Sequence, residues 1–159
     1  MIKKIKYLRC KFLEFITHKI ALPAIGKFRK KQKFPYTMEQ LLQLPDNTLG
    51  KDLALYLQKM NFKLLPNYER HDCKHIILQY EMDELGEARM QFYFLGNRHY
   101  SIPVLSTVFF CFLLMPEHWK QFRKDYALGK KGRSFDGVDF SAIVLQNTSE
   151  LRKFYQTYN

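Results

Sequence analysis

Four side chains that can bind a metal ion lie within seventeen positions of this chain: His71, Asp72, His75 and Glu87. Residues four apart share one face of an α-helix, so a helix through this segment points His71 and His75 in the same direction, with Asp72 flanking that face. Neutral imidazoles combined with carboxylates suit zinc, and also iron or manganese. The spacing therefore predicts a metal site with mixed nitrogen and oxygen ligands.

Glu87 follows His75 by twelve residues, which on one straight helix would separate the two by roughly 18 Å. The chain must therefore turn between them. Asp83 is a favourable N-cap residue and Gly86 relaxes the backbone, so a second helix that begins near Asp83 can carry Glu87 back to the histidines. We expect a pair of helices that holds one divalent ion, whose charge two carboxylates would balance.

The same motif could also belong to a plain surface helix, a zinc protease or a phosphohydrolase. Two histidines four apart on a surface helix are common by chance, although Asp72 and Glu87 favour a metal site. A zinc protease needs a glutamate directly after the first histidine as general base, and this chain has Asp72 there. A phosphohydrolase with adjacent His and Asp ligands needs a further upstream histidine, and His18 lies in a basic leader. Cys73 projects to another face of the helix and is expected to pack.

The pattern His71-Asp72-x-x-His75, then eleven residues and Glu87, resembles the zinc motif of the Coq4 family of ubiquinone-biosynthesis proteins. The flanking sequence is similar too. Residues 44–50 resemble the Leu-Pro…Thr-Leu-Gly helix start of that family, and residues 83–87 resemble the segment with its last ligand. Residues 126–131 and 138–140 resemble its closing region, so the resemblance covers roughly residues 39 to 155.

The resemblance implies a function in making ubiquinone or a related prenylated quinone. Such proteins are associated with decarboxylation and hydroxylation of a polyprenyl-hydroxybenzoate ring, and with organising other enzymes of the pathway. We expect an enzyme, a metal-dependent lyase (decarboxylase) whose zinc or other divalent ion stabilises charge on the ring. The expected ligands of this ion are His71, Asp72, His75 and Glu87. Glu84 and Lys74 are candidate catalytic residues that carry protons beside the metal.

The main alternative is a non-catalytic scaffold that binds a prenyl lipid and organises a biosynthetic complex at the membrane. Its zinc would only join two helices, and a closed four-ligand site would favour it. The chain departs from the family at Cys73-Lys74, where bulkier aromatic residues are more usual, and at Gln79-Tyr80, where a glycine is expected. These departures leave the ligands intact. They leave a different quinone, isoprenoid or aryl lipid as an alternative substrate.

The charge of the chain is very unevenly distributed. Residues 1–33 contain eleven basic side chains and one acidic side chain, whereas the rest contains 15 and 14, within a net charge of +11. Apolar residues recur at helical spacing in the leader, which predicts a basic amphipathic helix. Such a helix binds an anionic membrane surface or packs on the domain. Three scattered cysteines indicate a reducing compartment rather than a disulfide framework.

Lysines interrupt any apolar core in the leader, which argues against a secretory signal, and a mitochondrial leader is missing. We therefore expect the bacterial cytoplasm, with peripheral attachment to the inner membrane. The expected partners are a polyprenylated aromatic or isoprenoid lipid, the anionic membrane surface and other quinone-biosynthesis enzymes, with a homodimer as an open alternative. The nearly neutral body and the lack of a known binding motif argue against nucleic acid.

Helical patterns predict an all-α, single-domain helical bundle over residues 34–159, preceded by the basic helix and connector of residues 1–33. The predicted helices lie within 34–44, 48–60, 70–81, 83–95, 101–115, 117–126 and 139–155. Thr37 is the expected N-cap of the first helix, and residues 129–137 are expected to form a basic loop. The residues expected on the core faces of the second and third helices are Leu49, Leu53, Tyr56, Leu57, Met60, Ile76, Ile77 and Tyr80. Residues 101–115 are the most apolar run and contain no charge. As a helix they span roughly 22 Å, less than the roughly 30 Å of a bilayer core. They therefore predict a buried central helix, which could also line an apolar cleft for a prenyl tail.

Overall fold

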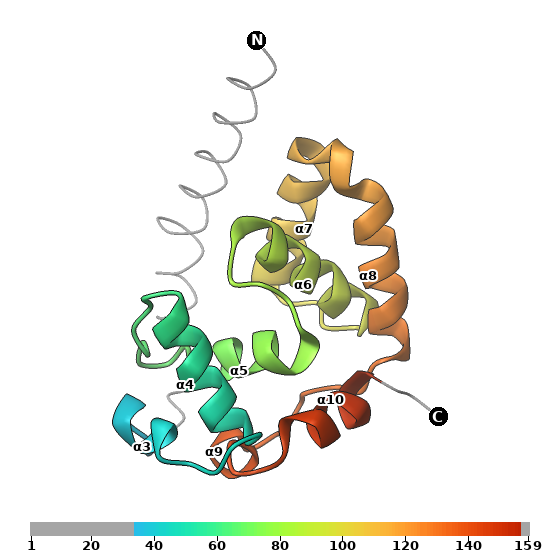
Figure 1. The fold of residues 1–159 in the computed structure, drawn as a ribbon. Coiled ribbons are helices and arrows are strands. Elements are labelled where there is room, and N and C mark those ends of the chain that lie inside the picture. The colour runs from blue at the N-terminus through green and yellow to red at the C-terminus, as the bar shows by residue number, and fades with distance from the viewer. Residues whose placement is uncertain (1–33, 157–159) are drawn as a thin grey trace. The chain divides into compact units, whose positions relative to one another are not determined.

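A computed structural model describes residues 34–156, in which helices are joined by turns and loops (Figure 1). Within this range no strand forms, and the only β contact is an isolated bridge between Thr48 and Asn147. The predicted all-α fold is confirmed. The predicted leader helix falls outside the described residues. The described chain divides into two compact units, residues 81–130 and residues 34–80 with 131–156.

The unit of residues 34–80 and 131–156 contains five helices within the described range. They are α3 (Met38–Leu42), α4 (Leu49–Lys59), α5 (Glu69–Leu78), α9 (Phe140–Ile143) and α10 (Thr148–Gln156). Thr37 begins α3 with a capping box, because its side chain accepts from the Gln40 amide while the Gln40 side chain accepts from the Thr37 amide. The predicted Thr37 cap is confirmed. Thr48 caps α4 with its side chain, which accepts a hydrogen bond from the Lys51 amide.

Helix α4 packs against both α3 and α5. Its residues Leu49, Leu53 and Leu57 recur at helical spacing and are buried, as the sequence predicts. Met60 was expected on the same face, but it follows the last helical residue and is exposed. Helix α5 contributes Ile76 and Ile77 to the core, again as predicted.

The unit of residues 81–130 contains α6 (Glu84–Gly96), α7 (Ile102–Leu114), the 3-10 turn η2 (Pro116–His118) and most of α8 (Trp119–Lys131). Its core is aromatic. Phe92 of α6 and Phe122 of α8 are stacked, with ring centroids 4.2 Å apart. Arg89 and the fully buried Asp125 add a two-pronged ion pair between the same helices, with the Nε–Oδ2 atoms 3.0 Å apart and the Nη2–Oδ1 atoms 3.2 Å apart.

Helices α6 and α8 approach each other so closely that their contact requires glycine. A Cβ atom on Gly129 would lie 1.9 Å from the Tyr93 carbonyl oxygen, and one on Gly96 would lie 2.1 Å from the Tyr126 carbonyl oxygen. The Asn97 side chain also donates a hydrogen bond to the Gly129 carbonyl. The predicted basic loop of residues 129–137 is confirmed for residues 132–137, but its start was wrong, because Gly129 serves helix packing and α8 continues to Lys131.

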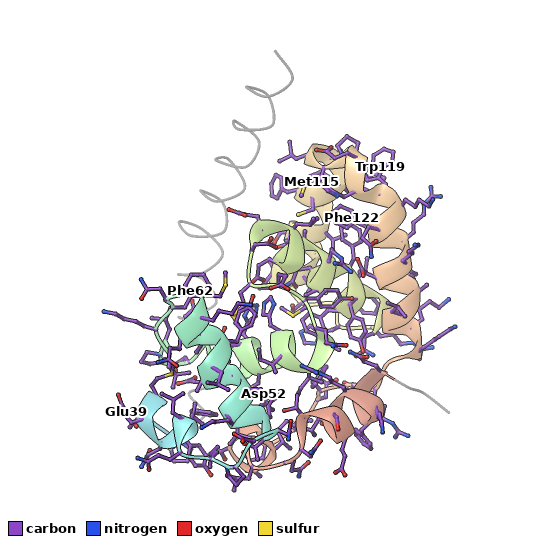
Figure 2. All side chains as sticks on the ribbon, in the orientation of Figure 1. Glu39, Asp52, Phe62, Met115, Trp119 and Phe122 are labelled. Atoms are coloured by element: carbon purple, nitrogen blue, oxygen red, sulfur yellow. The ribbon has the colours of Figure 1, made fainter. Side chains whose placement is uncertain are left out.

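Helix α7 is not the buried helix that its composition predicts. Only Val104 and Cys111 are buried, whereas Ile102 is 84% exposed and Phe109 is 58% exposed. The physical reason is that α7 packs against α6 along one face only. Figure 2 shows Met115, Trp119 and Phe122 around the turn that leads from α7 into α8. In residues 34–156 no single helix is long and apolar enough to cross a membrane, although the pair α7 and 116–131, bent by 100°, passes that test jointly.

Candidate metal centre

Helix α5 holds the two histidines of the motif one turn apart on one face, as predicted. Their rings meet edge to face, with centroids 4.8 Å apart and planes inclined by 63°. His75 is 1% exposed, while His71 is half-buried. A buried imidazole beside a more open one is suited to a site that is reached from the His71 side.

The carboxyl end of α5 is closed by hydrogen bonds around His75. Gln79 adopts the left-handed conformation, with φ of 61°, which ends the helix. Its amide and the amide of Tyr80 both donate to the His75 carbonyl. From α10, Arg152 donates to the Ile76 carbonyl and Gln156 donates to the Ile77 carbonyl. The carbonyls of His75, Ile76 and Ile77 at this helix end therefore have hydrogen-bond donors, which fixes the backbone that carries His75.

A single contact determines which nitrogen of His75 can act as a ligand. Its Nδ1 atom lies 3.1 Å from the carbonyl oxygen of Tyr80. A carbonyl oxygen can only accept a hydrogen bond, so Nδ1 carries the proton and Nε2 carries the lone pair of the neutral ring. Histidine ligands of metals are commonly oriented by such a backbone carbonyl. No pattern of residue types signals this contact, because the acceptor is a main-chain atom.

Glu87 lies in the first turn of α6, where Asp83 caps the helix through a 2.7 Å hydrogen bond from the Gly86 amide. The predicted Asp83 cap and the restarted helix are confirmed. Gly86 is required here because an added Cβ would lie 2.0 Å from the Glu81 carbonyl oxygen. This close approach allows the chain to turn sharply just before the carboxylate.

His71, His75 and Glu87 each offer one ligand atom, and these three atoms lie within 4.8 Å of one another. Metal–ligand bonds of about 2.1 Å allow donors on one ion to lie up to about 4.2 Å apart. The three atoms are therefore a group that could hold one divalent ion. Two nitrogens and one carboxylate oxygen are a donor set that suits zinc, iron or manganese. The residues present fit a metal ion, so this group could bind one.

Asp72, the fourth predicted ligand, does not belong to this group of three. Its Oδ1 atom lies 3.5 Å from Nδ1 of His71. From there it can accept a hydrogen bond from the His71 ring and leave Nε2 as the ligand atom, a common arrangement behind metal-bound histidines. Its assignment as a ligand stays a prediction.

The proposed proton carriers have different surroundings. Glu84 is exposed in the first turn of α6. The Lys74 ammonium lies 5.5 Å from the ring centroid of Phe135 and 5.9 Å from that of Phe140, which gives it a cation–π contact. Their roles in proton transfer stay predictions. Cys73 is buried, and this burial, with the charges of Asp72 and Glu69, raises the pKa of its thiol well above the usual range, which agrees with packing.

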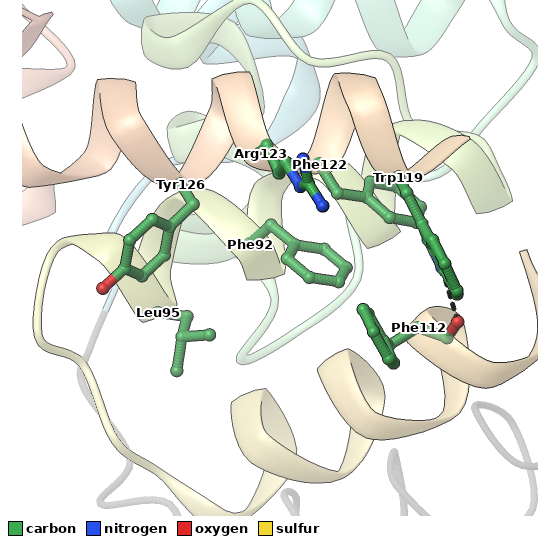
Figure 3. A pocket seen from close by; sticks show the side chains of 7 residues that line it. All are labelled: Phe92, Leu95, Phe112, Trp119, Phe122, Arg123 and Tyr126. Atoms are coloured by element: carbon green, nitrogen blue, oxygen red, sulfur yellow. Dashed lines mark hydrogen bonds between the residues drawn. The ribbon is translucent and has the colours of Figure 1, made fainter. Parts of the chain in front are cut away.

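An apolar pocket of about 250 Å³ lies among α6, α7 and α8 (Figure 3). Phe112 and Trp119 form one wall, where their rings stack 4.6 Å apart and the indole Nε1 donates to the Phe112 carbonyl. The remaining lining residues are Phe92, Leu95, Phe122, Arg123 and Tyr126. The sequence predicted an apolar cleft along 101–115. In this pocket α7 contributes Phe112, and most of the lining comes from α6 and α8.

Fold and site together define an all-α protein with a candidate His-His-Glu metal centre. No family model and no curated protein matches the chain. A crystal structure of a putative ubiquinone biosynthesis protein from Nostoc punctiforme PCC 73102 is similar, with a TM-score of 0.64. The match covers 96% of this chain and 81% of that one, at 19% sequence identity. At this identity the likeness shows a shared fold.

Proposed function

We propose that this chain is a Coq4-like protein of ubiquinone, or related prenylated quinone, biosynthesis, and that it works with a divalent metal. One observation carries the proposal: His71, His75 and Glu87 offer ligand atoms within 4.8 Å of one another. Two further facts support it. The motif and its flanks resemble the Coq4 family, and the Nostoc structure, which shares the fold, is described as a putative ubiquinone biosynthesis protein.

The proposed reaction is the decarboxylation, with hydroxylation at the same carbon, of a polyprenyl-hydroxybenzoate ring. A bound divalent ion would supply Lewis-acid stabilisation of the negative charge that develops on the ring. His71, His75 and Glu87 would hold the ion, and the Tyr80 carbonyl would keep the His75 ring in the orientation it needs. When the carboxylate leaves as carbon dioxide, its electron pair stays on the ring carbon. Hydroxylation of that carbon would require a two-electron oxidant as co-substrate, dioxygen or a peroxide, which accepts this electron pair and supplies the hydroxyl oxygen. Glu84 and Lys74 are the proposed carriers of protons to and from this position.

Three protein ligands support catalysis over a purely structural role. Catalytic zinc sites typically have three protein ligands and keep another position for water or substrate, whereas structural sites are closed by four. The alternative function is a non-catalytic prenyl-lipid scaffold. Asp72 is the observation that favours this alternative, because its carboxylate lies beside His71 and would close the site if it turned onto the ion.

The polyprenyl tail of the substrate requires an apolar surface and a membrane as its source. The pocket of about 250 Å³ is smaller than the roughly 300–1,000 Å³ of most small-molecule sites, so it would hold only part of such a tail. The basic leader of residues 1–33 would attach the protein to an anionic inner-membrane surface from the bacterial cytoplasm. Other quinone-biosynthesis enzymes are the proposed protein partners.

The decisive experiment measures carbon dioxide release from a short-tailed prenyl-hydroxybenzoate by the full-length, metal-loaded protein. We expect turnover that stops on chelation, returns on adding the metal and is absent in His75→Ala. The matched control is His99→Ala, which changes an exposed histidine outside the group and should leave turnover intact. Binding of about one metal ion per chain without turnover would favour the scaffold. Absence of metal binding would refute both.

A further inference from the structure

The exposed side of α7 is a continuous apolar stripe. At 3.6 residues per turn, five exposed side chains fall within an arc of about 100°. They are Ile102, Leu105, Phe109, Phe112 and Leu113. The two buried residues of the helix, Val104 and Cys111, fall on the opposite side. The helix is thus attached to the protein by one face and presents large apolar side chains on the other.

The buried face of α7 packs against the core of this unit. Cys111 belongs to a core cluster with Ala88, Phe92 and Phe122, and Val108 and Leu114 pack against it. At the carboxyl end, Phe112 stacks on Trp119, whose indole N–H is hydrogen-bonded to the Phe112 carbonyl. The stripe is therefore displayed by a fixed helix, and its outward apolar side chains are available to something outside residues 34–156.

Cations lie at the end of this stripe. Lys120, Arg123 and Lys124 are exposed in the first two turns of α8. Arg123 lines the same pocket as Phe112 and Trp119, which places one of these cations beside the stripe (Figure 3). The following acid, Asp125, is fully buried against Arg89, so it does not present its charge to an outside partner. The turn before Trp119 carries one exposed acid, Glu117, so three exposed cations and one exposed acid lie in residues 116–124. The surface therefore combines an apolar stripe, an aromatic edge and a net positive charge.

We propose that the α7 stripe docks on the surface of an anionic lipid bilayer. In this arrangement α7 lies along the interface, with the five stripe side chains at the level of the upper acyl chains. Trp119 then lies at the headgroup level, where tryptophan is enriched. The cations of α8 contact anionic headgroups, which add to the binding energy of interfacial helices.

A bilayer fits this surface better than a second copy of the chain. Protein interfaces carry about one hydrogen bond per 100–200 Å², and the five stripe side chains contain no donor or acceptor. A second copy would offer the same exposed cations, Lys120, Arg123 and Lys124, whereas an anionic lipid surface complements them. The inference deepens the proposed membrane location and rests on it, but it assigns the contact to α7 in addition to the leader.

Trp119 provides a direct test, because it is the single tryptophan of the chain. Full-length protein is titrated with vesicles of phosphatidylglycerol and phosphatidylcholine, and with vesicles of phosphatidylcholine alone. We expect the emission of Trp119 to shift to shorter wavelength with the anionic vesicles, and lipids brominated near the top of the acyl chain to quench it. Binding without any change in this emission overturns the proposal, and this result requires no variant.

Variants then separate the stripe from the leader. Phe109→Asp with Leu113→Asp should lower the partition coefficient at least tenfold, whereas Leu145→Asp, at a similarly exposed leucine far along the chain, should not change it. Circular dichroism checks that each variant is folded. If Lys3→Glu with Lys4→Glu abolishes binding while the stripe variant binds normally, the leader alone docks, and the stripe proposal fails while the membrane location stands. If the stripe variant converts a dimer to a monomer and leaves vesicle binding unchanged, the stripe contacts a second copy of the chain. This result would also overturn the stripe proposal.

Discussion

The guanidinium of Arg152 donates two hydrogen bonds to the carbonyl oxygen of Ile76, with Nε 3.2 Å and Nη2 3.1 Å from it. Seventy-six positions separate the two residues along the chain. Ile76 follows His75 directly, and its carbonyl is one of those that the end of α5 leaves without a partner within the helix. A positive side chain also complements the negative end of the helix dipole. The C-terminal helix thereby holds the backbone that carries the buried histidine.

Replacement of Arg152 by methionine should therefore weaken both the fold and the site. Methionine keeps the apolar stem and removes both hydrogen bonds, so we expect the free energy of unfolding to fall by about 1.5–3 kcal/mol. We also expect weaker zinc binding, because the His75 ring loses part of its fixed support. Urea denaturation and competitive zinc titration measure the two effects. The control Lys153→Met, on the next and exposed residue, should change stability by no more than about 0.5 kcal/mol.

The two carboxylates of the motif should differ in their effect on the metal. Glu87→Gln and His75→Ala remove members of the ligand group, and we expect each to lose the bound ion in elemental analysis of purified protein. Asp72→Asn should keep about one ion per chain and lower its affinity about 10–100-fold, as loss of a hydrogen-bond partner behind a ligand does. Loss of the ion from Asp72→Asn would instead restore Asp72 to the ligand set and favour the closed, structural site.

Gln79 gives a prediction about stability alone. It has a φ of 61°, in the region where side chains other than glycine are strained, and it is exposed. The resemblance to the Coq4 family led us to expect a glycine in this stretch. Gln79→Gly should raise the free energy of unfolding by about 0.5–1 kcal/mol, since relief of strain outweighs the added flexibility of the unfolded chain. Asn61→Gly, at φ of 55°, should give a smaller gain, because asparagine tolerates this conformation.

Helices that cover one side of a core were predictable from the sequence. The leucines of α4 recur on one face, and Thr37 and Asp83 mark the starts of α3 and α6, so local patterns determine these elements. The two histidines were predictable for the same reason, because their spacing alone places them on one face. The Glu87 carboxylate was predictable once a turn was allowed between α5 and α6.

Features that depend on distant contacts were not predictable. Composition cannot tell a helix buried on all sides from one with an outward apolar face, so α7 was assigned to the centre. The glycine at 129 looked like a loop residue, although it permits the close packing of α8 on α6. Support for His75 comes from a main-chain carbonyl and from a helix near the end of the chain, and no local pattern indicates either.

Burial of ionisable groups in the unit of residues 81–130 predicts a loss of stability in alkali. Burial raises the pKa of Cys111 from 9.0 to about 12 and that of Tyr93 from 10.0 to about 12. Above pH 9 the unfolded chain therefore releases protons that the folded chain retains. The folded state loses stability as the pH rises from about 9 toward 12, and keeps its full contribution from these groups below pH 9.

Urea denaturation at a series of pH values should show this decline. Cys111→Ala should make it shallower between pH 9 and pH 12, although the variant is less stable overall because it loses buried volume. Val108→Ala removes volume beside the same core cluster without removing a proton, so it should lower stability and keep the wild-type slope. If the wild type and Cys111→Ala show the same slope, the Cys111 thiol ionises as readily in the folded protein as in the unfolded chain. That result would contradict the prediction, which rests on the burial of this thiol.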